Sequence, residues 1–314
     1  MSESLISLAT EKFYAFPHKD VPSCWRRLHV DASIVKSIAQ ACEVQELQKV
    51  VETLDMALIV AGGEGKQQEI HRLLDALDDS KVTKRIKLDI PKEFNITTPE
   101  IKLKYPIERR PAPSVTAFEQ HMNDTHTPLI LTDSISHWPA LSLWKQPSHL
   151  LKRTLNGTRI VPIELGSSYV SESWSQNLIS FSEFLSTHLL HNTDPKGYLA
   201  QHDLLSQIPG FYKDISTPDY CYTSPPRDPP DGPQVQFIET EDVMRNIWLG
   251  PAGTRSPLHN DPYENIFAQV VGYKYFRLYS PTMTEKVYPR GIEGGIQMGN
   301  TSQVIHSKDV IDVG

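Results

Sequence analysis

The chain has 314 residues, of which 39% are hydrophobic and 22% charged, with a formal net charge of −7 at pH 7 and a pI near 5.9. This length allows one large domain and a smaller one, and the composition is that of an ordinary globular protein. The acidic balance provides no bulk attraction to nucleic acid, and the sequence shows neither an apolar run of membrane-spanning length nor a signal peptide. We therefore expect no membrane and no direct nucleic-acid partner, and a nuclear or cytoplasmic protein that is not secreted.

Three cysteines, Cys24, Cys42 and Cys221, are scattered along the chain. Their odd number and their spacing favour neither a disulfide framework nor a cysteine-rich zinc site. We expect each of them to pack as a small buried hydrophobe.

Residues 1–90 predict helices, because apolar residues recur at three- and four-residue steps and a glycine pair, Gly62-Gly63, provides an end signal. The residues of this pattern are Val35, Ile38, Cys42, Leu47, Val50, Val51, Leu54 and Leu58, followed in a second helix by Ile70, Leu73, Leu74 and Leu77. We interpret these stripes as the core of a small helical region. His29 then lies at the surface or at a helix end.

Residues 91–113 predict a linker, because they are rich in proline, mixed in charge and without hydrophobic periodicity. Beyond the linker the pattern changes to short apolar and β-branched runs, which indicate strands, and one segment has helical spacing. The expected strands are 128–132, 159–164 and 196–201, and the expected helix is 181–190. The change of period separates a helical part from a part rich in strands.

One pair of side chains has the chemistry of a metal site. His259 and Asp261 are two positions apart, and in a strand such residues project to the same face. An imidazole and a carboxylate arranged in this way, completed by a histidine from a distant strand, form the facial set that suits non-haem Fe(II). By itself the spacing is weak, because a solvated turn before a strand explains it better.

The stretch that follows favours a metal site over a solvated turn. Val270–Tyr279 is an apolar, β-branched and aromatic run that predicts a buried strand, and Lys274 lies within it. Burying an ammonium group is costly unless an anion meets it. Because the chain supplies no obvious carboxylate, we expect a dicarboxylic cosubstrate to bind Lys274.

Several segments in the right order resemble the Jumonji-C family of Fe(II)- and 2-oxoglutarate-dependent oxygenases over about residues 110–305. The resemblance rests on Val161-Pro-Ile-Glu-Leu-Gly, Gly197-Tyr-Leu-Ala-Gln-His, Trp248-Leu-Gly-Pro, Ser256-Pro-Leu-His-Asn-Asp, Gly272-Tyr-Lys-Tyr-Phe-Arg-Leu-Tyr-Ser-Pro and Asn300-Thr-Ser-Gln-Val. Together with the helical region predicted at 1–90 and the linker predicted at 91–113, the resemblance predicts an α+β protein. Residues 114–314 would form a cupin-like double-stranded β-helix, or jelly roll, as the oxygenase domain.

The resemblance also implies how Fe(II) and 2-oxoglutarate bind. His259 and Asp261 would be two of the three metal ligands and thereby the catalytic centre. The ammonium of Lys274 would hold the distal carboxylate of 2-oxoglutarate. Hydrogen bonds to the cosubstrate would come from three further side chains. These are Tyr198, Ser256 and Asn265.

For the substrate, the resemblance implies a pocket lined by Glu164, Gln201 and Trp248. This set suits a cationic side chain, because Glu164 supplies a countercharge and Trp248 a π face. Ordinary barrel packing would explain Trp248, Tyr198 or Asn265 taken singly. Their joint occurrence around a metal pair favours a site.

The implied reaction couples the oxidative decarboxylation of 2-oxoglutarate to the oxidation of a C–H bond in a protein side chain. A stable hydroxyl group would leave a hydroxylated arginine in a partner protein. On an N-methyl group the same reaction would remove the methyl, as in demethylation of methyl-lysine in a histone tail. The sequence leaves both outcomes open, whereas Lys274 and Ser256 disfavour a small-molecule dioxygenase on the same barrel.

In the family the third ligand is a histidine on a later strand, and this chain ends at Gly314 before such a strand. The one histidine beyond the Asn300 segment, His306, lies where the family has no ligand. We therefore expect the jelly roll to lack its last strands, the iron to be held weakly, and the chain to turn over little or no 2-oxoglutarate. The alternative is a catalytically inactive cupin-like module that binds partners.

Overall fold

The computed structural model describes residues 1–42, 47–79, 89–166, 174–226, 242–293, 296–297 and 300–304. Its contacts divide the chain into two units, each built from separate segments. Unit 1 comprises Met1–Phe94, Gln146–Tyr212 and Asn246–Thr254, and unit 2 comprises Asn95–Lys145, Lys213–Arg245 and Arg255–Gly314. The fold is α+β, as expected, while the linear division into helical region, linker and oxygenase domain stays a prediction. Within the described ranges, no helix has both the length and the apolar character needed to cross a membrane.

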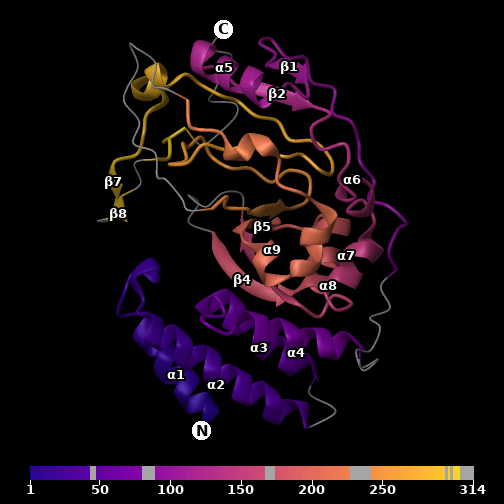
Figure 1. Cartoon of the computed structure of the whole chain (residues 1–314), viewed down its shortest axis with the longest axis vertical. Helices are drawn as coiled ribbons and strands as arrows, with labels where there is room; N and C mark the ends of the chain where they lie inside the picture. The colour runs from indigo at the N-terminus through magenta and orange to yellow at the C-terminus, as the bar shows by residue number, and fades with distance from the viewer. Residues whose placement is uncertain are drawn as a thin grey trace. The chain divides into compact units, whose positions relative to one another are not determined.

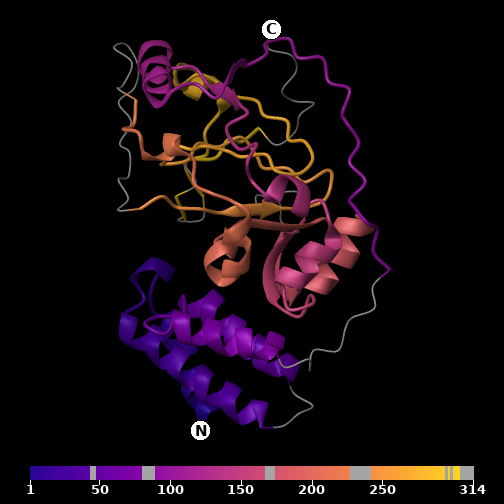
Figure 2. The ribbon, with the colours of Figure 1, turned by 45° about the vertical axis from the view of Figure 1, so that its right-hand side comes forward.

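Unit 1 begins with four helices that pack alongside one another (Figure 2). They are α1 (Ser2–Phe13), α2 (Ser23–Ala41), α3 (Leu47–Ala61) and α4 (Gln67–Asp79), with a short 3-10 turn η1 (His18–Asp20) after α1. Val51, Leu54 and Ile70 are fully buried in their shared core. Helix α3 ends where predicted, at Gly62 and Gly63, which adopt φ of +66° and +64° and donate their N–H groups to carbonyls of the last turn. The apolar stripes of α3 and α4 are confirmed.

The single helix predicted from Val35 to Leu58 is divided in the structure, where α2 ends at Ala41 and α3 begins at Leu47, and the stripe is wrong for the α2 part. Val35 and Ile38 are 55% and 53% exposed, while α2 turns a face that includes Ala32, Ser33 and Ser37 into the bundle. The buried face also includes Val30, which belongs to the core of the bundle, so the face that is covered is not the one carrying Val35 and Ile38. A periodic pattern reports one helical face, but the packing of neighbouring helices decides which face is covered.

The expectation for the cysteines is also not met. Cys24 and Cys42 are exposed, and Cys221 is half-buried. Both exposed residues lie at the ends of α2, Cys24 in its first turn and Cys42 at its C-cap. Burial raises the pKa of the Cys221 thiol.

Unit 1 also contains a four-stranded antiparallel sheet with the order β4-β3-β5-β6 (Figure 1). Its strands are β3 (Ile160–Leu165), β4 (Ser175–Ser180), β5 (Gly197–His202) and β6 (Ile247–Leu249). Helical segments flank it, namely α7 (Pro147–Arg153), α8 (Phe181–Glu183), the π-helical turn η2 (Phe184–Leu190), α9 (Leu204–Gln207) and η3 (Pro209–Asp214). Ile163 and Leu199 are buried on one face of the sheet. The predicted strands 159–164 and 196–201 and the helical segment 181–190 are confirmed.

Unit 2 is built from shorter elements. Strands β1 (Glu108–Pro111) and β2 (Leu129–Thr132) pair in parallel, and β7 (Ile292–Glu293) pairs with β8 (Ile296–Gln297) in antiparallel. The helical segments are α5 (Val115–Thr125), α6 (Ala140–Leu143), η4 (Asp219–Tyr222) and η5 (Pro281–Val287). Ser114 caps α5 by accepting a hydrogen bond from the N–H of Ala117 at 3.2 Å. Strand β2 confirms the strand predicted at 128–132.

The buried strand predicted at Val270–Tyr279 is wrong. None of these ten residues, all of which the structure describes, is part of a strand, and Tyr273, Tyr275 and Leu278 are 59%, 51% and 58% exposed. A preference for strands reflects how side chains fit a pleated, half-buried surface rather than an intrinsic backbone choice. Here the described residues give this run no strand to pair with, so its composition alone does not produce one.

A buried ion pair fixes α3 against the sheet of unit 1. The Asp55 carboxylate, 0% exposed, accepts hydrogen bonds from Arg159 Nη2 at 2.7 Å and Nε at 2.9 Å. The same carboxylate accepts the backbone N–H of Ile160 at 2.7 Å and Gln207 Nε2 at 2.9 Å. A buried charge is tolerated only when it is paired and its lone pairs are satisfied, and both conditions hold here. Helix α3 is therefore tied to β3 and α9 by directional bonds.

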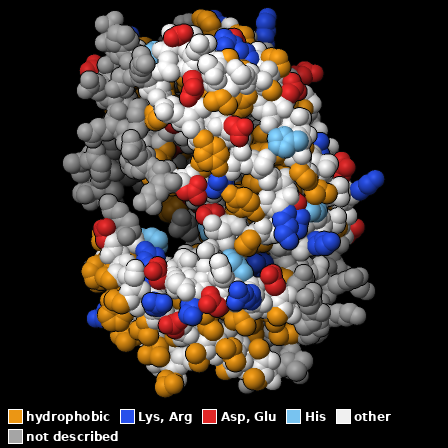
Figure 3. Space-filling model, viewed as in Figure 1, with side chains coloured by type: hydrophobic (Ala, Val, Ile, Leu, Met, Phe, Trp, Pro, Cys, Tyr) orange, Lys and Arg blue, Asp and Glu red, His pale blue; other side chains and the backbone are white. Residues whose placement is uncertain are grey.

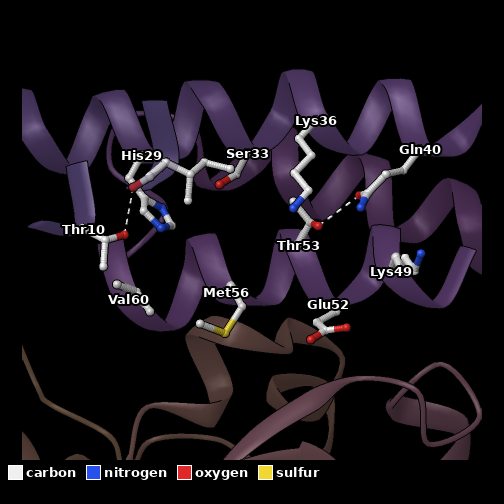
Figure 4. Close-up of a pocket in the computed structure, with 11 residues that line it drawn as sticks. Thr10, His29, Ser33, Lys36, Gln40, Lys49, Glu52, Thr53, Met56 and Val60 are labelled. Carbon is white, nitrogen blue, oxygen red and sulfur yellow. Dashed lines mark hydrogen bonds between the residues drawn. The ribbon is translucent and has the colours of Figure 1, made fainter. Parts of the chain in front are cut away.

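A cavity of about 350 Å³ lies among α1, α2 and α3 (Figure 4). His29 lines it from α2, is 3% exposed, and packs its ring against Phe13 with centroids 5.6 Å apart. Among the residues that the structure describes, none forms a hydrogen bond with His29 Nδ1. Burial lowers the pKa of His29, because the charged imidazolium is disfavoured away from water. The interpretation of His29 as a surface histidine is therefore wrong.

We expect Asp55→Ala to destabilise the protein by about 3–5 kcal/mol, because the substitution leaves the buried Arg159 guanidinium without its counterion. Urea unfolding followed by circular dichroism measures this loss. The matched control is Asp31→Ala on the exposed side of α2, which should stay within about 0.5 kcal/mol of the wild type. Equal stability of the two variants would show that the ion pair does not hold α3 in place.

We expect His29 to make the protein less stable in acid. Its folded-state pKa lies below the unfolded value of about 6.5, so the unfolded chain binds more protons as the pH falls through this range. Stability is thus complete above about pH 6.5 and declines below it, by at most about 1.4 kcal/mol per pH unit for one group. Thermal melting from about pH 7.5 to about pH 5.5 should therefore show a smaller decline for His29→Leu than for the wild type. The exposed control His18→Leu should keep the wild-type decline, and an unchanged decline in His29→Leu would contradict the prediction.

Candidate active site

The nine predicted site residues are divided between the two units, and each group is described within its own unit. Unit 1 holds Glu164, Tyr198, Gln201 and Trp248, and unit 2 holds Ser256, His259, Asp261, Asn265 and Lys274. The first group contains the predicted substrate residues, and the second contains the predicted metal pair.

In unit 2 the metal pair lies in a short antiparallel contact rather than in the regular strand that the spacing suggested. His259 bridges Thr301, and the neighbouring backbone bonds run from Asn260 N–H to Asn300 at 3.0 Å and from Ser302 N–H to Leu258 at 2.8 Å. His259 Nε2 and Asp261 Oδ1 nevertheless face each other, 3.8 Å apart. The expected juxtaposition of imidazole and carboxylate is therefore present.

Further hydrogen bonds orient both side chains as a metal site requires. His259 Nδ1 donates to the backbone carbonyl of Pro257 at 2.7 Å, and in the neutral imidazole this leaves the lone pair on Nε2. Asn265 Nδ2 donates to Asp261 Oδ2 at 3.0 Å, which turns Oδ1 toward the histidine. Metal-binding histidines commonly donate their second nitrogen to a carbonyl group, and metal-binding carboxylates are themselves hydrogen-bonded. The donor atoms and their supporting bonds fit Fe(II).

Asn265 thus contacts the metal pair directly, whereas the sequence suggested a hydrogen bond to 2-oxoglutarate. No group of three or more His, Cys, Asp or Glu side chains within the described ranges is arranged to hold a metal ion. His306 lies outside the described residues. The described part of the chain therefore offers two candidate ligands, His259 and Asp261, and their role in metal binding stays a prediction.

Lys274 lies over two aromatic rings of unit 2. Its Nζ is 5.2 Å from the ring centroid of Phe267 and 5.6 Å from that of Phe276, and these two rings pack edge to face 4.9 Å apart. Burial lowers the pKa of the Lys274 ammonium, although the residue as a whole is exposed. Ser256 is exposed on the loop before the metal pair. The burial in a strand that led us to expect an anion beside Lys274 is therefore not present, and its role as an anchor for a carboxylate stays a prediction.

In unit 1, Glu164 and Tyr198 are cross-strand neighbours on β3 and β5. Burial raises the pKa of the Glu164 carboxyl. The indole N–H of Trp174 partly offsets this rise, although it forms no hydrogen bond of normal geometry. Burial and the neighbouring Glu164 raise the pKa of Tyr198 to about 12. At neutral pH the phenol therefore keeps its proton and can donate a hydrogen bond.

Gly250 provides the space that the Tyr198 ring occupies. A Cβ atom at position 250 would lie 2.5 Å from Tyr198 Cδ2, closer than non-bonded atoms approach. The packing of the Tyr198 ring therefore explains why a glycine follows Trp248-Leu249 in this segment. Any larger residue there would push the Tyr198 ring out of place.

Trp248 shares a face of the sheet with Glu164 and Tyr198. Leu199 pairs with Leu249, and side chains alternate along each strand, so the residues next to this pair project to the opposite face. The Trp248 ring is 42% exposed there. Gln201 is also exposed, and its backbone has a φ of +51° at an irregularity of β5. A carboxylate, a phenol and an indole thus lie together on three adjacent strands.

Two residues that the sequence did not single out support this sheet. Gln207 is 3% exposed and donates to both Asp55 and the carbonyl of Ile160, and His202 bonds to Gln207. A glutamine at the end of a four-residue helix carries no pattern that marks it as buried. The charge pair Asp55–Arg159 could have been suspected from a carboxylate inside the apolar stripe of α3.

The comparisons with known proteins agree with this chemistry. Residues 115–312 match the family model "Cupin-like domain". The chain is 32% identical to "Lysine-specific demethylase 8" of Danio rerio, in an alignment that covers 99% of this chain and 76% of that protein. It is 31% identical to "Jumonji C domain-containing protein 5" of Drosophila melanogaster, over 96% of this chain and 72% of that protein. It is 41% identical to "Lysine-specific demethylase 8" of Xenopus tropicalis, in an alignment that covers 61% of this chain and 39% of that protein.

The family model spans more than half of the chain, and the similarity to the zebrafish and fly proteins extends over nearly all of it. The resemblance first seen in separate segments is therefore confirmed along the sequence. The chain belongs to the cupin-like Jumonji-C family of 2-oxoglutarate-dependent oxygenases.

Proposed function

We propose that this chain is an Fe(II)- and 2-oxoglutarate-dependent oxygenase that acts on a cationic side chain of a protein. The observation that carries the proposal is the orientation of His259 and Asp261 by Pro257 and Asn265, which presents Nε2 and Oδ1 to a shared position. A solvated turn would need neither bond. Their joint presence supports a metal site beyond the His-x-Asp spacing.

The residues of unit 2 would bind the metal and the cosubstrate. His259 Nε2 and Asp261 Oδ1 would hold Fe(II), and Lys274 would neutralise the distal carboxylate of 2-oxoglutarate, with Ser256 as a hydrogen-bond donor. Bound iron and 2-oxoglutarate supply the oxidation of the substrate C–H bond, with succinate and CO2 as products. By the family resemblance, Tyr198 of unit 1, which is protonated at neutral pH, would donate a further hydrogen bond to 2-oxoglutarate.

The residues of unit 1 would select the substrate. Glu164, Gln201 and Trp248 present a carboxylate, an amide and a half-exposed ring, a set that suits a long cation such as a methylated lysine or an arginine. We favour methyl-lysine of a histone tail, because similar proteins from zebrafish and frog carry the name lysine-specific demethylase. Hydroxylation of arginine in a partner protein is the second candidate, since the same pocket chemistry accepts a guanidinium group.

The surface is consistent with recognition of a cationic segment rather than of nucleic acid. Figure 3 shows acidic and basic side chains interspersed over the face it presents, and the chain has a formal net charge of −7. Nucleic-acid binding depends on clustered basic residues that contact phosphates. The nuclear or cytoplasmic location stays a prediction.

A non-catalytic binding module is the competing function, because the described residues supply two metal ligands. Anaerobic titration with Fe(II) and 2-oxoglutarate separates the two functions, since chelation of Fe(II) by 2-oxoglutarate produces a visible charge-transfer band. Because two protein ligands hold iron weakly, we expect the band with the wild type when Fe(II) is in excess over the protein, and we expect His259→Ala and Asp261→Ala to weaken Fe(II) binding by at least about 10-fold. Asn260→Ala, which changes the residue between the two ligands, is the control and should bind as the wild type does. Absence of the band with the wild type would favour the binding module.

We expect Glu164→Gln to raise the KM for a cationic peptide by about 10-fold and to leave the KM for 2-oxoglutarate unchanged, because the substitution removes the countercharge of the substrate. Histone-tail peptides with one methyl-lysine and the same peptides with arginine serve as probes, with succinate release as the measurement. The matched control is Glu183→Gln at an exposed position of α8 in the same unit.

The pH dependence provides a second measurement on Glu164. Its pKa is raised by burial, so the carboxylate is lost as the pH falls through this raised value, and peptide binding by the wild type should weaken over that range. The variant Glu164→Gln should show a flatter profile. A wild-type profile that does not change on the acid side would argue against Glu164 as the countercharge.

A further inference from the structure

Between two successive pairs of β5 and β6, strand β5 contains one residue more than β6. Leu199 pairs with Leu249, but His202 pairs with Ile247, so that two residues of β5 stand opposite Trp248 alone. This arrangement is a β-bulge, and Gln201 within it has a φ of +51°. Bulges re-aim side chains, and they occur next to functional sites more often than elsewhere.

The bulge decides where Gln201 and His202 project. In a regular strand Gln201 would share the face of Leu199, which is 0% exposed in the core. Instead Gln201 is exposed, and His202 takes the position toward the buried side that pairs with Ile247. Because of the bulge, the side chain of Gln201 lies at the surface instead of in the core.

A residue other than glycine at positive φ is strained and persists where its surroundings hold it. The surroundings here are hydrogen bonds on the buried side of β5, where His202 Nε2 lies 2.7 Å from Gln207 Oε1. In Figure 1, β5 and α9, which contain these two residues, lie next to each other. The side chain that follows the strained residue is therefore clamped to α9.

We call the hydrogen bond between His202 and Gln207 the clamp, and its donor and acceptor can be assigned. Gln207 Nε2 donates to Asp55 Oδ1 at 2.9 Å and to the Ile160 carbonyl at 2.7 Å, so its amide cannot be flipped without turning Oε1 toward two acceptors. The oxygen must face His202, which makes Nε2 of that histidine the donor. Arg159 Nη2 donates to the backbone carbonyl of Gln207 at 2.8 Å, so both the side chain and the backbone of Gln207 are hydrogen-bonded.

We propose that His202 and Gln207 are positioning residues, which connect the Asp55 carboxylate of α3 to the bulge of β5 and hold Gln201 on the substrate side of the sheet. The N-terminal helices then have a role in the site although none of their residues is predicted to touch the substrate. The proposal rests on the proposed function for the role of Gln201. The clamp itself is a property of unit 1 that can be measured without a substrate.

The variant His202→Phe tests the clamp, because it keeps a ring of similar size, removes the bond to Gln207 and leaves the bonds between Gln207 and Asp55 intact. Hydrogen–deuterium exchange followed by mass spectrometry is measured on the full chain for peptides that cover 197–203. We expect exchange in this segment to be about 10-fold faster than in the wild type. The variant Ser180→Ala, which removes the cap of α8 in the same unit, controls for a general loss of stability and should leave exchange at 197–203 unchanged.

The second measurement is turnover with histone-tail peptides that contain methyl-lysine or arginine. His202→Phe should raise the KM for the peptide by about 5-fold while the KM for 2-oxoglutarate stays constant, a split that a merely less stable protein would not show. His202→Gln, which can still donate to Gln207, should restore part of the wild-type KM. Faster exchange together with this split supports the proposal.

Two outcomes would overturn it. Unchanged exchange at 197–203 in His202→Phe would show that the clamp does not hold the bulge, whatever the turnover. Faster exchange with an unchanged peptide KM would show that the bulge does not position a substrate residue. Failure of the wild type to turn over any of the peptides, with faster exchange in His202→Phe, would instead contradict the proposed function and leave the clamp itself supported.

Discussion

The buried carboxylate of Asp55 is the constraint on which unit 1 depends. Apolar packing between a helix and a sheet tolerates small shifts, but an unpaired buried charge costs several kcal/mol, so α3 is confined to the position in which every oxygen of Asp55 is bonded. Its partners are a guanidinium, a backbone N–H and the Gln207 amide. Because Gln207 also bonds to His202, the same constraint extends to the strand that carries the candidate substrate residues.

The features predicted correctly are those that depend on neighbours in sequence. The strand at 197–202 follows from local composition, and the end of α3 at Gly62 follows from its positive φ. The closeness of His259 and Asp261 was also predictable, since two residues at this spacing meet in an extended segment, whether or not a full strand forms. The family resemblance added the remaining site residues, which no local pattern would have joined.

The features that were missed depend on partners distant in sequence. The buried face of α2 is decided by the helices that approach Ala32 and Ser33, not by the apolar area of Val35. The bulge at Gln201 arises because β5 has two residues opposite one residue of β6. The alternation of apolar and polar residues along β5 alone cannot show this mismatch. The strand expected at Val270–Tyr279 had the right composition but lacked a pairing partner among the described residues. In each case tertiary contacts override a correct local preference.

The electrostatics of the sheet face explain why it suits a monocation. Tyr198 is protonated at neutral pH, as an ordinary phenol is, and burial together with the neighbouring Glu164 raises its pKa further, to about 12. Above its raised pKa, Glu164 provides the negative charge among these described residues, on the same face as the half-exposed Trp248. A lysine or arginine side chain matches that charge and gains from the ring as well. A dianionic guest would be repelled by the Glu164 carboxylate, which is the physical basis for proposing a cationic substrate.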